Sequence, residues 1–233
     1  MEYDISEISK YIQIAKDKHK EGNLYQANEI YKKLINQKIY TYDLLISYGL
    51  FNREINNLKI AKNLFFLSVK KYPLIIKPYI LLAEILRKES NFNDAIKTLF
   101  AAKKIEKSNS DIHYNLSITY RAFKSFKDAL LSIDFAIKLQ PKNQIYKILK
   151  ADILTESFQN EEAKELLTNL KLPKDSFLHF QREILISKLL INQKKYTKAE
   201  EVLLNLKILF NKEKILYLNL SDLYFKNNEL EKG

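Results

Sequence analysis

Side chains that could carry catalysis or bind a metal ion are few and scattered in this sequence. Its three histidines, His19, His113 and His179, stand far apart, whereas histidines that share a zinc ion are usually spaced by roughly three to five residues. It has no cysteine, which excludes disulfides, thiolate metal sites and cysteine nucleophiles. Glu161-Glu162 suits the start of a helix, where acids favour the positive end of the dipole. The three glycines form no phosphate-binding motif. We therefore expect no enzyme active site, no metal site and no cofactor.

Arginine is the residue type whose spacing does suggest chemistry. Arg53, Arg87 and Arg121 follow one another at intervals of 34 residues, and His19 precedes Arg53 by the same interval. A guanidinium group binds a carboxylate through two parallel hydrogen bonds, so such a row would suit an acidic segment of a partner. The alternative is local pairing, because Glu84 stands three residues before Arg87. Both interpretations remain open, and exposed ion pairs alone would contribute little.

The interval of 34 residues extends through most of the chain. It separates five successive alanines, and the last gap is 36: Ala27, Ala61, Ala95, Ala129, Ala163 and Ala199. Twelve positions before each of them stands another small residue: Ala15, Gly49, Ala83, Ser117, Ala151 and Ser187. Small side chains that face one another allow two helices to approach to about 8–10 Å between axes. Large apolar residues four positions after each alanine would fill the same face. The pattern predicts repeated pairs of antiparallel helices.

The clearest unit is His113-Tyr-Asn-Leu116-Ser117-Ile-Thr-Tyr120, followed by Phe126-Lys-Asp-Ala129, Ile133, Ala136 and Pro141. This pattern resembles the tetratricopeptide repeat (TPR), and the resemblance covers nearly the whole chain. The family favours Trp where His113 stands and Gly where Ser117 stands. The resemblance implies an all-α fold, an α-solenoid of stacked antiparallel helix pairs wound as a right-handed superhelix. It also implies a non-catalytic scaffold that binds other proteins.

We expect a single TPR-like repeat domain over residues 1–233. Its units are predicted at 8–41, 42–75, 76–109, 110–143, 144–179 and 180–213, with a partial unit at 214–233. The fifth unit should be the least regular, because Lys147 and Lys150 replace apolar residues and Leu172-Pro173-Lys174-Asp175 lengthens its exit. The turns between the two helices of a unit contain Gly, Asn and Ser, which tolerate left-handed conformations.

The partial unit lacks the polar face that a terminal helix of a solenoid needs. One interpretation is that the chain is the N-terminal TPR portion of a longer enzyme, such as a glycosyltransferase, sulfotransferase or methyltransferase. The other is that the face docks a partner, or a second copy through self-association of the C-terminal helix.

By the same resemblance, first helices line a concave groove. The partner-binding residues predicted there are Arg53, Arg87, Arg121, Tyr114, Asn115, His19, Ile46 and Ile80. The isoleucines either offer an apolar strip to a bound peptide or pack against the neighbouring first helix. Some TPR proteins grip a chaperone carboxyl terminus with Lys and Asn on three first helices. Asn115 suits one of those positions, but Ile80, Glu84, Ile145 and Leu149 do not, so that clamp is not reproduced.

The formal net charge of +11 permits a nucleic acid or an anionic membrane as partner. Lysines are mixed with acids throughout and form no run of five or six, which makes a basic nucleic-acid-binding repeat the least favoured alternative. The sequence predicts neither a signal peptide nor a membrane-spanning helix. The absence of cysteine fits a cytoplasmic location.

Overall fold

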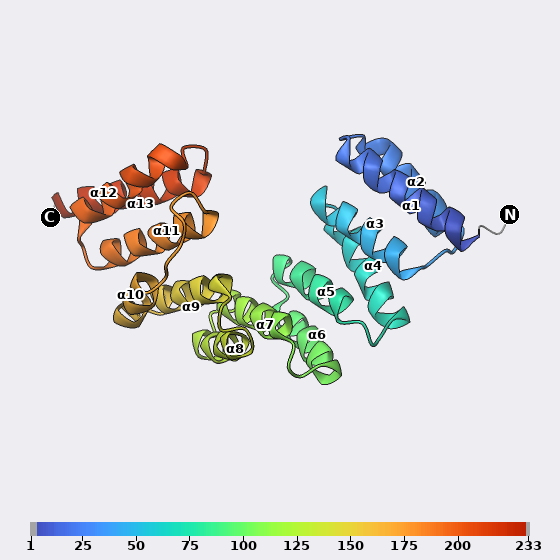
Figure 1. Ribbon diagram of the computed structural model, residues 1–233, viewed down its shortest axis with the longest axis horizontal. Helices are drawn as coiled ribbons and strands as arrows, with labels where there is room; N and C mark the ends of the chain where they lie inside the picture. Colours follow the sequence, from blue (N-terminus) through green and yellow to red (C-terminus); the bar gives the residue numbers. More distant parts are fainter. Residues whose placement is uncertain (1–3, 232–233) are drawn as a thin grey trace. The chain divides into compact units, whose positions relative to one another are not determined.

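The structure is all-α. It is a computed structural model that describes residues 4–231, without the side chains of residues 5 and 228–231. Over this range thirteen α-helices follow one another and no β-strand occurs. The helices pack as consecutive antiparallel pairs, which makes the chain an α-solenoid (Figure 1). None of the described helices is both long and apolar enough to cross a membrane.

The chain divides into two compact units, residues 1–115 and 116–233, with the division inside α7. Unit 1 contains the first three helix pairs and the start of the next helix: α1 (Ile5–Lys20), α2 (Leu24–Asn36), α3 (Tyr42–Glu54), α4 (Leu58–Lys71), α5 (Ile76–Lys88), α6 (Phe92–Ile105) and part of α7 (Ser110–Ala122). In the predicted repeats, odd-numbered helices are the first helices of their pairs.

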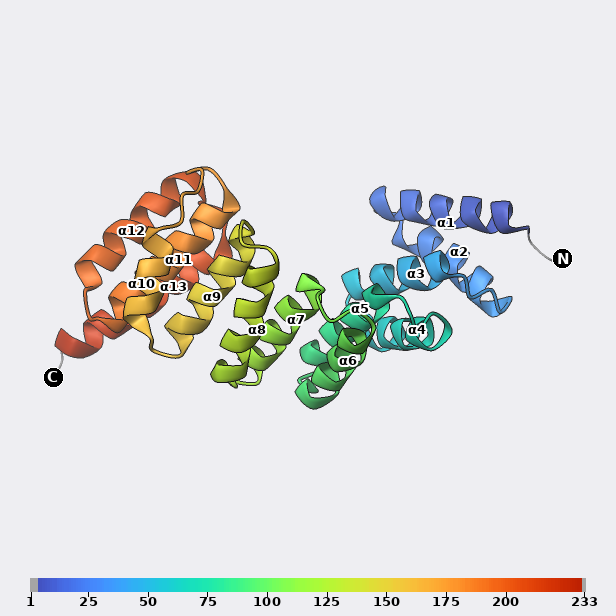
Figure 2. The same ribbon diagram turned by 60° about the horizontal axis from the view of Figure 1, so that its bottom comes forward.

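Unit 2 contains the rest of α7 and six further helices: α8 (Phe126–Leu139), α9 (Gln144–Glu156), α10 (Asn160–Thr168), α11 (Phe177–Asn192), α12 (Tyr196–Leu209) and α13 (Lys214–Glu231). Within this unit α11 packs on α12, and α13 contacts both of them (Figure 2). The partial unit predicted at 214–233 is the single helix α13, and residues 232–233 lie outside the described range.

Small residues sit at the contacts between paired helices, as the repeat predicts. Ala27, Ala61 and Ala95 in unit 1 are completely buried. The tightest contact is at Gly49 on α3, where an added Cβ atom would lie 2.3 Å from Cε1 of Phe65 on α4. The phenyl ring therefore occupies the space that a side chain at position 49 would need, and glycine permits the pair to close.

Every turn between paired helices contains one residue in the left-handed conformation. Gly22, Asn56 and Ser90 adopt it in unit 1, with φ between 59° and 79°. Three residues with larger side chains adopt it in unit 2: Lys124, Phe158 and Lys194. These larger residues do not favour positive φ, so the packing of the two helices imposes the turn.

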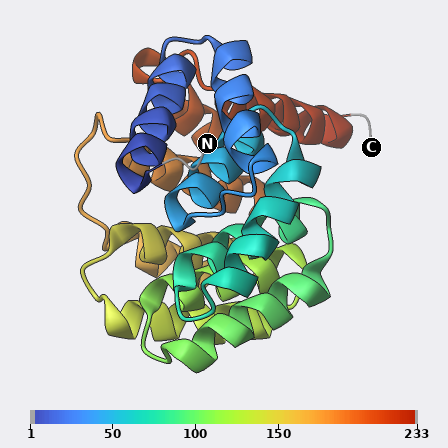
Figure 3. The ribbon, with the colours of Figure 1, turned by 90° about the vertical axis from the view of Figure 1, so that its right-hand side faces the viewer.

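The fifth repeat is the irregular one, as expected. Its second helix, α10, has 9 residues, fewer than any other described helix. The connection from α10 to α11 then runs as an open segment, visible at the left edge of Figure 3. Pro173 lies in this segment and can neither continue a helix nor donate a backbone hydrogen bond.

The small-residue contacts can be tested by a pair of substitutions at the same repeat position. Gly49→Ala should lower the free energy of unfolding by roughly 1–3 kcal/mol, because the methyl group must displace Phe65. Ser117→Ala should be neutral or stabilising, because the buried Ser117 hydroxyl has no hydrogen-bond partner among the residues that the structure describes. Urea unfolding followed by circular dichroism measures both. Equal stability of Gly49→Ala and the parent protein would contradict the close contact.

Candidate functional site

The first helices of unit 2 form a groove with two cavities. Helix α11 lies between α9 and α13 and contacts both, and we call this face the α9–α11–α13 groove. A polar cavity of about 230 Å³ is lined by Asp152, Thr155, Glu156, Phe158, Lys188, Ile191, Asn192, Asn219, Asp222 and Lys226. A more apolar cavity of about 120 Å³ is lined by Ile148, Asp152, Phe177, Phe180, Gln181, Ile184, Leu185, Lys188 and Ile215. Asp152 and Lys188 line both cavities.

Arg121 on α7 holds in place the two carboxylates that line the polar cavity, those of Asp152 and Glu156. Its guanidinium group donates to Asp152 over 2.7 Å and to Glu156 over 2.6 Å, both on α9. Lys124 adds a second cation at 3.2 Å from Glu156. The planar donors of arginine suit two carboxylates at once. The arrangement neutralises these carboxylates and ties α7 to α9.

The pKa values of Asp152 and Glu156 are shifted in opposite directions because the surroundings of the two carboxylates differ. Burial raises the pKa of Asp152, and the charges of Arg121 and Lys188 only partly oppose that effect. Burial also raises the pKa of Glu156, but hydrogen bonds and charge from Arg121 and Lys124 outweigh it, so its pKa lies below the usual value. One oxygen of Asp152, Oδ1, is buried without a hydrogen-bond partner among the described residues.

Lys188 on α11 is the cation that stands between the two cavities. It is half-buried, and it forms no ion pair with any residue in the described part of the chain. Its charge acts on Asp152, which already accepts a hydrogen bond from Arg121. The Lys188 ammonium group therefore acts on Asp152 without forming an ion pair with it.

Phe158 borders the polar cavity from the turn between α9 and α10. Its φ is 61°, and its side chain is 76% exposed. A bulky residue in the left-handed region carries backbone strain, and an exposed phenyl ring adds nothing to the core. Features of this kind tend to cluster at functional sites, and Phe158 lies beside a cavity.

Unit 1 has the same type of ion pairing along its first helices. His19 on α1 lies 3.2 Å from Glu54 on α3, and Arg53 on α3 donates to Glu84 on α5 over 2.9 Å. The His19 ring also contacts Phe51 edge-on at 5.0 Å. A cavity of about 480 Å³ opens beside these helices and is lined by Lys16, His19, Lys20, Tyr31, Ser47, Leu50, Phe51 and Glu54.

The remaining predicted groove residues lie in unit 1 and differ in exposure. Ile46 is 5% exposed and belongs to the core, while Ile80 and Tyr114 are half-buried. Asn115 donates to the carbonyl oxygen of Asp111 over 2.8 Å. Burial lowers the pKa of Arg87, while the charge of Glu84 acts in the opposite direction. Arg87 and Tyr114 thus share one electrostatic neighbourhood with Glu84.

Two members of the arginine row, Arg53 and Arg121, are held by acids on the following first helix. Arg53 reaches a residue 31 positions ahead and Arg121 one 35 positions ahead. The sequence-based interpretation considered local pairing only within a helix and missed these partners. The sequence did hold a signal for these partners. Glu84 and Asp152 each stand eleven positions before a repeat alanine, and each lies about one repeat after an arginine of the row. It also missed Lys188 and Phe158.

The histidines show no shared arrangement in the described residues. His113 is 3% exposed, burial lowers its pKa, and its ring bonds the carbonyl oxygen of Lys107 at 2.9 Å. It packs where the repeat pattern favours an aromatic residue. Over residues 4–231 no group of three or more His, Asp or Glu side chains is arranged to hold a metal ion.

Comparison with known proteins identifies the fold. No protein-family model matches the sequence, and no curated protein matches it. Among solved structures, a tetratricopeptide repeat protein from Parabacteroides merdae superposes with a TM-score of 0.76 at 11% identity, over 93% of this chain and 84% of that one. PilF of Pseudomonas aeruginosa gives a TM-score of 0.65 at 14% identity, over 92% and 97%. Yeast Tom70 gives 0.69 at 19% identity, over 96% and 47%.

The chain therefore has the fold of the tetratricopeptide-repeat proteins, as the repeat predicts. Such helix-pair repeats expose extended surfaces along their first helices, which are used to bind other proteins.

The role of Arg121 can be tested by replacing it with glutamine. Arg121→Gln should lower the free energy of unfolding by roughly 1–3 kcal/mol at neutral pH, because Asp152 and Glu156 lose their shared cation. The carboxylates of Asp152 and Glu156 form ion pairs with Arg121 only while they are ionised. The deficit should therefore shrink as pH falls through the pKa values of Asp152, which is raised, and Glu156, which is lowered.

Chemical denaturation of both proteins between about pH 7 and pH 3 measures this. The matched control is Lys124→Gln, since Lys124 is 71% exposed and should contribute little. A deficit that stays constant over the whole pH range would show that Arg121 acts through packing rather than charge.

Proposed function

We propose that the chain is a non-catalytic scaffold that binds a segment of another protein in the α9–α11–α13 groove. The observation that carries this proposal is the pair of cavities along three neighbouring first helices, one apolar and one polar, with Lys188 between them. The partner segment would place an apolar side chain in one cavity and a carboxylate against Lys188.

The apolar cavity can take an aliphatic or aromatic side chain. Phe177 is 55% exposed and stacks on Phe180, with ring centroids 5.6 Å apart. Ile215, 44% exposed, also lines this cavity. Covering these groups would remove apolar area from water, which is the main favourable term in protein association.

The acidic character of the partner rests on Lys188 rather than on Arg53 and Arg121. Those two arginines already bind carboxylates of their own chain. An acidic partner would have to displace these carboxylates before it could bind the arginines. Lys188 needs no such exchange. Its half-buried position strengthens the interaction with a carboxylate relative to one in open solvent.

We also propose that α13 self-associates with a second copy. Its Ser221 is exposed, whereas the residues at the same repeat position in unit 2, Ser117, Ala151 and Ser187, are completely buried. Leu218 on the same helix is 68% exposed, although its counterparts Ile148 and Ile184 are buried. A small residue between Leu218 and Phe225 suits a close helix–helix contact, and a second α13 offers the same surface in return.

The groove proposal can be tested by placing a photocrosslinking amino acid at Gln181, which lines the apolar cavity. In a lysate of the source organism it should capture a discrete protein. The same group at Lys164, exposed on α10, should not. Lys188→Glu should reduce capture at least tenfold and Lys188→Arg should preserve it, because only charge reversal repels the carboxylate.

Phe158→Asn supplies a variant that does not depend on charge. It should weaken capture through loss of the exposed ring, while leaving the fold as stable or more so, because Asn tolerates positive φ. Capture that is equal at Gln181 and Lys164, or unaffected by Lys188→Glu and Phe158→Asn together, would rule out the groove.

The self-association proposal predicts a concentration-dependent rise in mass for the parent protein in sedimentation equilibrium. Leu218→Asp should abolish it, because a charge would be buried in the helix contact. Leu204→Asp on α12, where the side chain is 45% exposed, is the control and should leave the mass unchanged. A monomeric parent protein at millimolar concentration would refute self-association.

A further inference from the structure

The positive charge of the protein is concentrated on one edge of each unit. In unit 1 this edge consists of the ends of the second helices, the connections and the starts of the next first helices, residues 33–45, 68–79 and 102–113. These segments hold 8 lysines and 3 acids, a balance of 8 − 3 = +5. We call them the basic edge of unit 1. The lysines appear evenly mixed along the sequence, but the fold gathers them.

The opposite edge of unit 1 is nearly neutral. Its turns within helix pairs, residues 17–27, 51–61 and 85–95, hold 6 bases and 5 acids, a balance of +1. Three of these bases, Lys18, Arg53 and Lys88, form ion pairs. In contrast, none of the eight lysines on the basic edge forms an ion pair or a side-chain hydrogen bond with another described residue, and seven of them are exposed.

Neighbouring connections on the basic edge touch one another. The Tyr72 hydroxyl donates to the carbonyl oxygen of Tyr40 over 3.0 Å, and its ring contacts Tyr42 edge-on at 5.5 Å. Lys71 lies over the Tyr40 ring at 5.2 Å from its centroid. The connections after α2 and α4 therefore form one surface, and their lysines act together.

An apolar tip stands among these lysines. The connection from α4 to α5 has the sequence Lys70-Lys71-Tyr-Pro-Leu74-Ile75-Ile-Lys77. Leu74 is 80% exposed and Ile75 is 38% exposed. Leu74 has the highest exposure among the large apolar side chains of the described residues. An uncovered aliphatic residue flanked on both sides by unpaired lysines calls for a partner that is both anionic and apolar.

We infer that the basic edge of unit 1 binds the surface of an anionic lipid bilayer, with Leu74 inserted at the level of the headgroups. Lysines near such a surface are attracted to anionic headgroups, and each adds to the affinity within about one Debye length. A single aliphatic tip contributes the apolar burial that peripheral attachment uses. Lysine stems can also lie along the apolar boundary while the ammonium groups stay in water.

A nucleic acid fits this surface less well. All four arginines of the chain lie outside the basic edges, although arginine is the residue that best grips phosphates and base edges. Exposed Leu74 offers no stacking surface to a base, whereas single-stranded nucleic acids are bound through aromatic platforms. The combination of lysine with an aliphatic tip is the one that a lipid surface accommodates.

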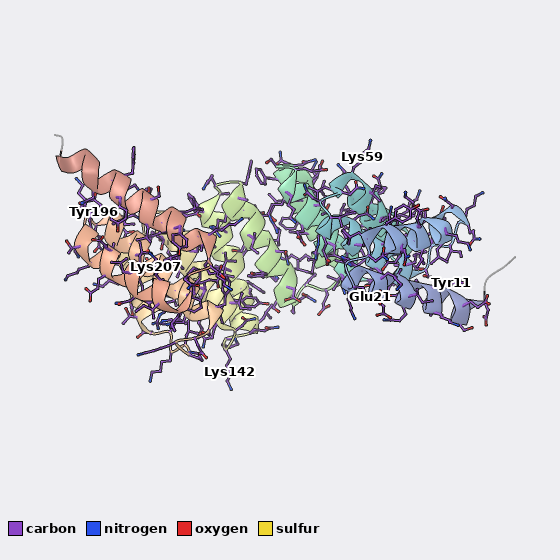
Figure 4. The ribbon with its side chains drawn as sticks, turned by 90° about the horizontal axis from the view of Figure 1, so that it is seen from above. Tyr11, Glu21, Lys59, Lys142, Tyr196 and Lys207 are labelled. Carbon is purple, nitrogen blue, oxygen red and sulfur yellow. The ribbon has the colours of Figure 1, made fainter. Side chains whose placement is uncertain are left out.

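Unit 2 repeats the composition at its own edge. Residues 136–147, 165–180 and 206–217 also hold 8 lysines and 3 acids. The opposite edge of unit 2, residues 119–129, 153–163 and 189–199, holds 6 bases and 4 acids. Lys142 on this edge projects away from the helices (Figure 4). Lys59, which lies on the opposite edge of unit 1, is labelled in the same figure for comparison. Ile208 is 77% exposed and Leu209 is 58% exposed beside this edge's last connection. The arrangement is thus built into the repeat.

The charge contribution can be measured by co-sedimentation of the full chain with vesicles. The parent protein should bind phosphatidylcholine–phosphatidylserine vesicles and not phosphatidylcholine alone, and binding should weaken in about 1 M salt. Reversal of Lys70, Lys71, Lys104 and Lys107 to Glu should lower the partition coefficient at least tenfold. Reversal of Lys20, Lys59, Lys127 and Lys198, all exposed and outside the basic edges, changes the net charge equally and should have a much smaller effect.

The insertion of the tip can be measured by fluorescence, because the chain contains no tryptophan. Leu74→Trp should show a blue-shifted emission and quenching by brominated lipids on phosphatidylserine vesicles. Tyr25→Trp, 76% exposed on the opposite edge, should show neither. Circular dichroism confirms that each variant is folded.

Three outcomes would overturn the inference. The parent protein would not bind anionic vesicles, both charge reversals would weaken binding equally, or Leu74→Trp would stay unshifted while the protein is bound. Tight binding of duplex DNA or an oligonucleotide at about 0.15 M salt, without vesicle binding, would assign the edge to nucleic acid instead. The photocrosslinking result at Gln181 does not depend on any of these outcomes.

Discussion

The structure depends on one steric constraint: the two helices of a pair touch at a point where one of them must carry a small side chain. Gly49 against Phe65 is the tightest case, since even a methyl group at position 49 would collide with the ring. In the other five helix pairs the same position is taken by buried Ala or Ser: Ala15, Ala83, Ser117, Ala151 and Ser187. Because the small residue recurs every 34 residues, each pair closes in the same way and presents the same faces.

This constraint explains which parts of the fold could be predicted. The succession of helix pairs follows from the spacing of small and large apolar residues. The left-handed turn residues follow only where the residue itself favours positive φ, as Gly22 and Asn56 do. Phe158 and Lys194 adopt the same conformation because the paired helices on either side fix the turn. Tertiary packing overrides local preference there, and a single sequence does not reveal it.

The candidate site was predicted less completely, because its key contacts join different repeats. The arginine row was visible as a spacing, but its partners lie about one repeat further along the chain, on the next first helix. Those ion pairs change the meaning of the row. Arg53 and Arg121 hold neighbouring first helices together, and the cation left open in the α9–α11–α13 groove is Lys188. Ile46, predicted for the groove, is buried in the core instead.

The distribution of charge follows from the same repeat geometry. Near the ends of the first helices, bases and acids of successive pairs lie close together, and arginine, the cation suited to bidentate pairing, forms the ion pairs between α3 and α5 and between α7 and α9. The connections between pairs have few acids, and lysines in the last turn of every second helix except α10 favour the negative end of the helix dipole. A preference that is local to each helix therefore adds up to a basic edge on each unit. Each repeat adds a small excess of lysine over acids at its connection, and stacking places these excesses on the same edge of a unit. An even spread of lysine along the sequence therefore does not imply an even spread over the molecule.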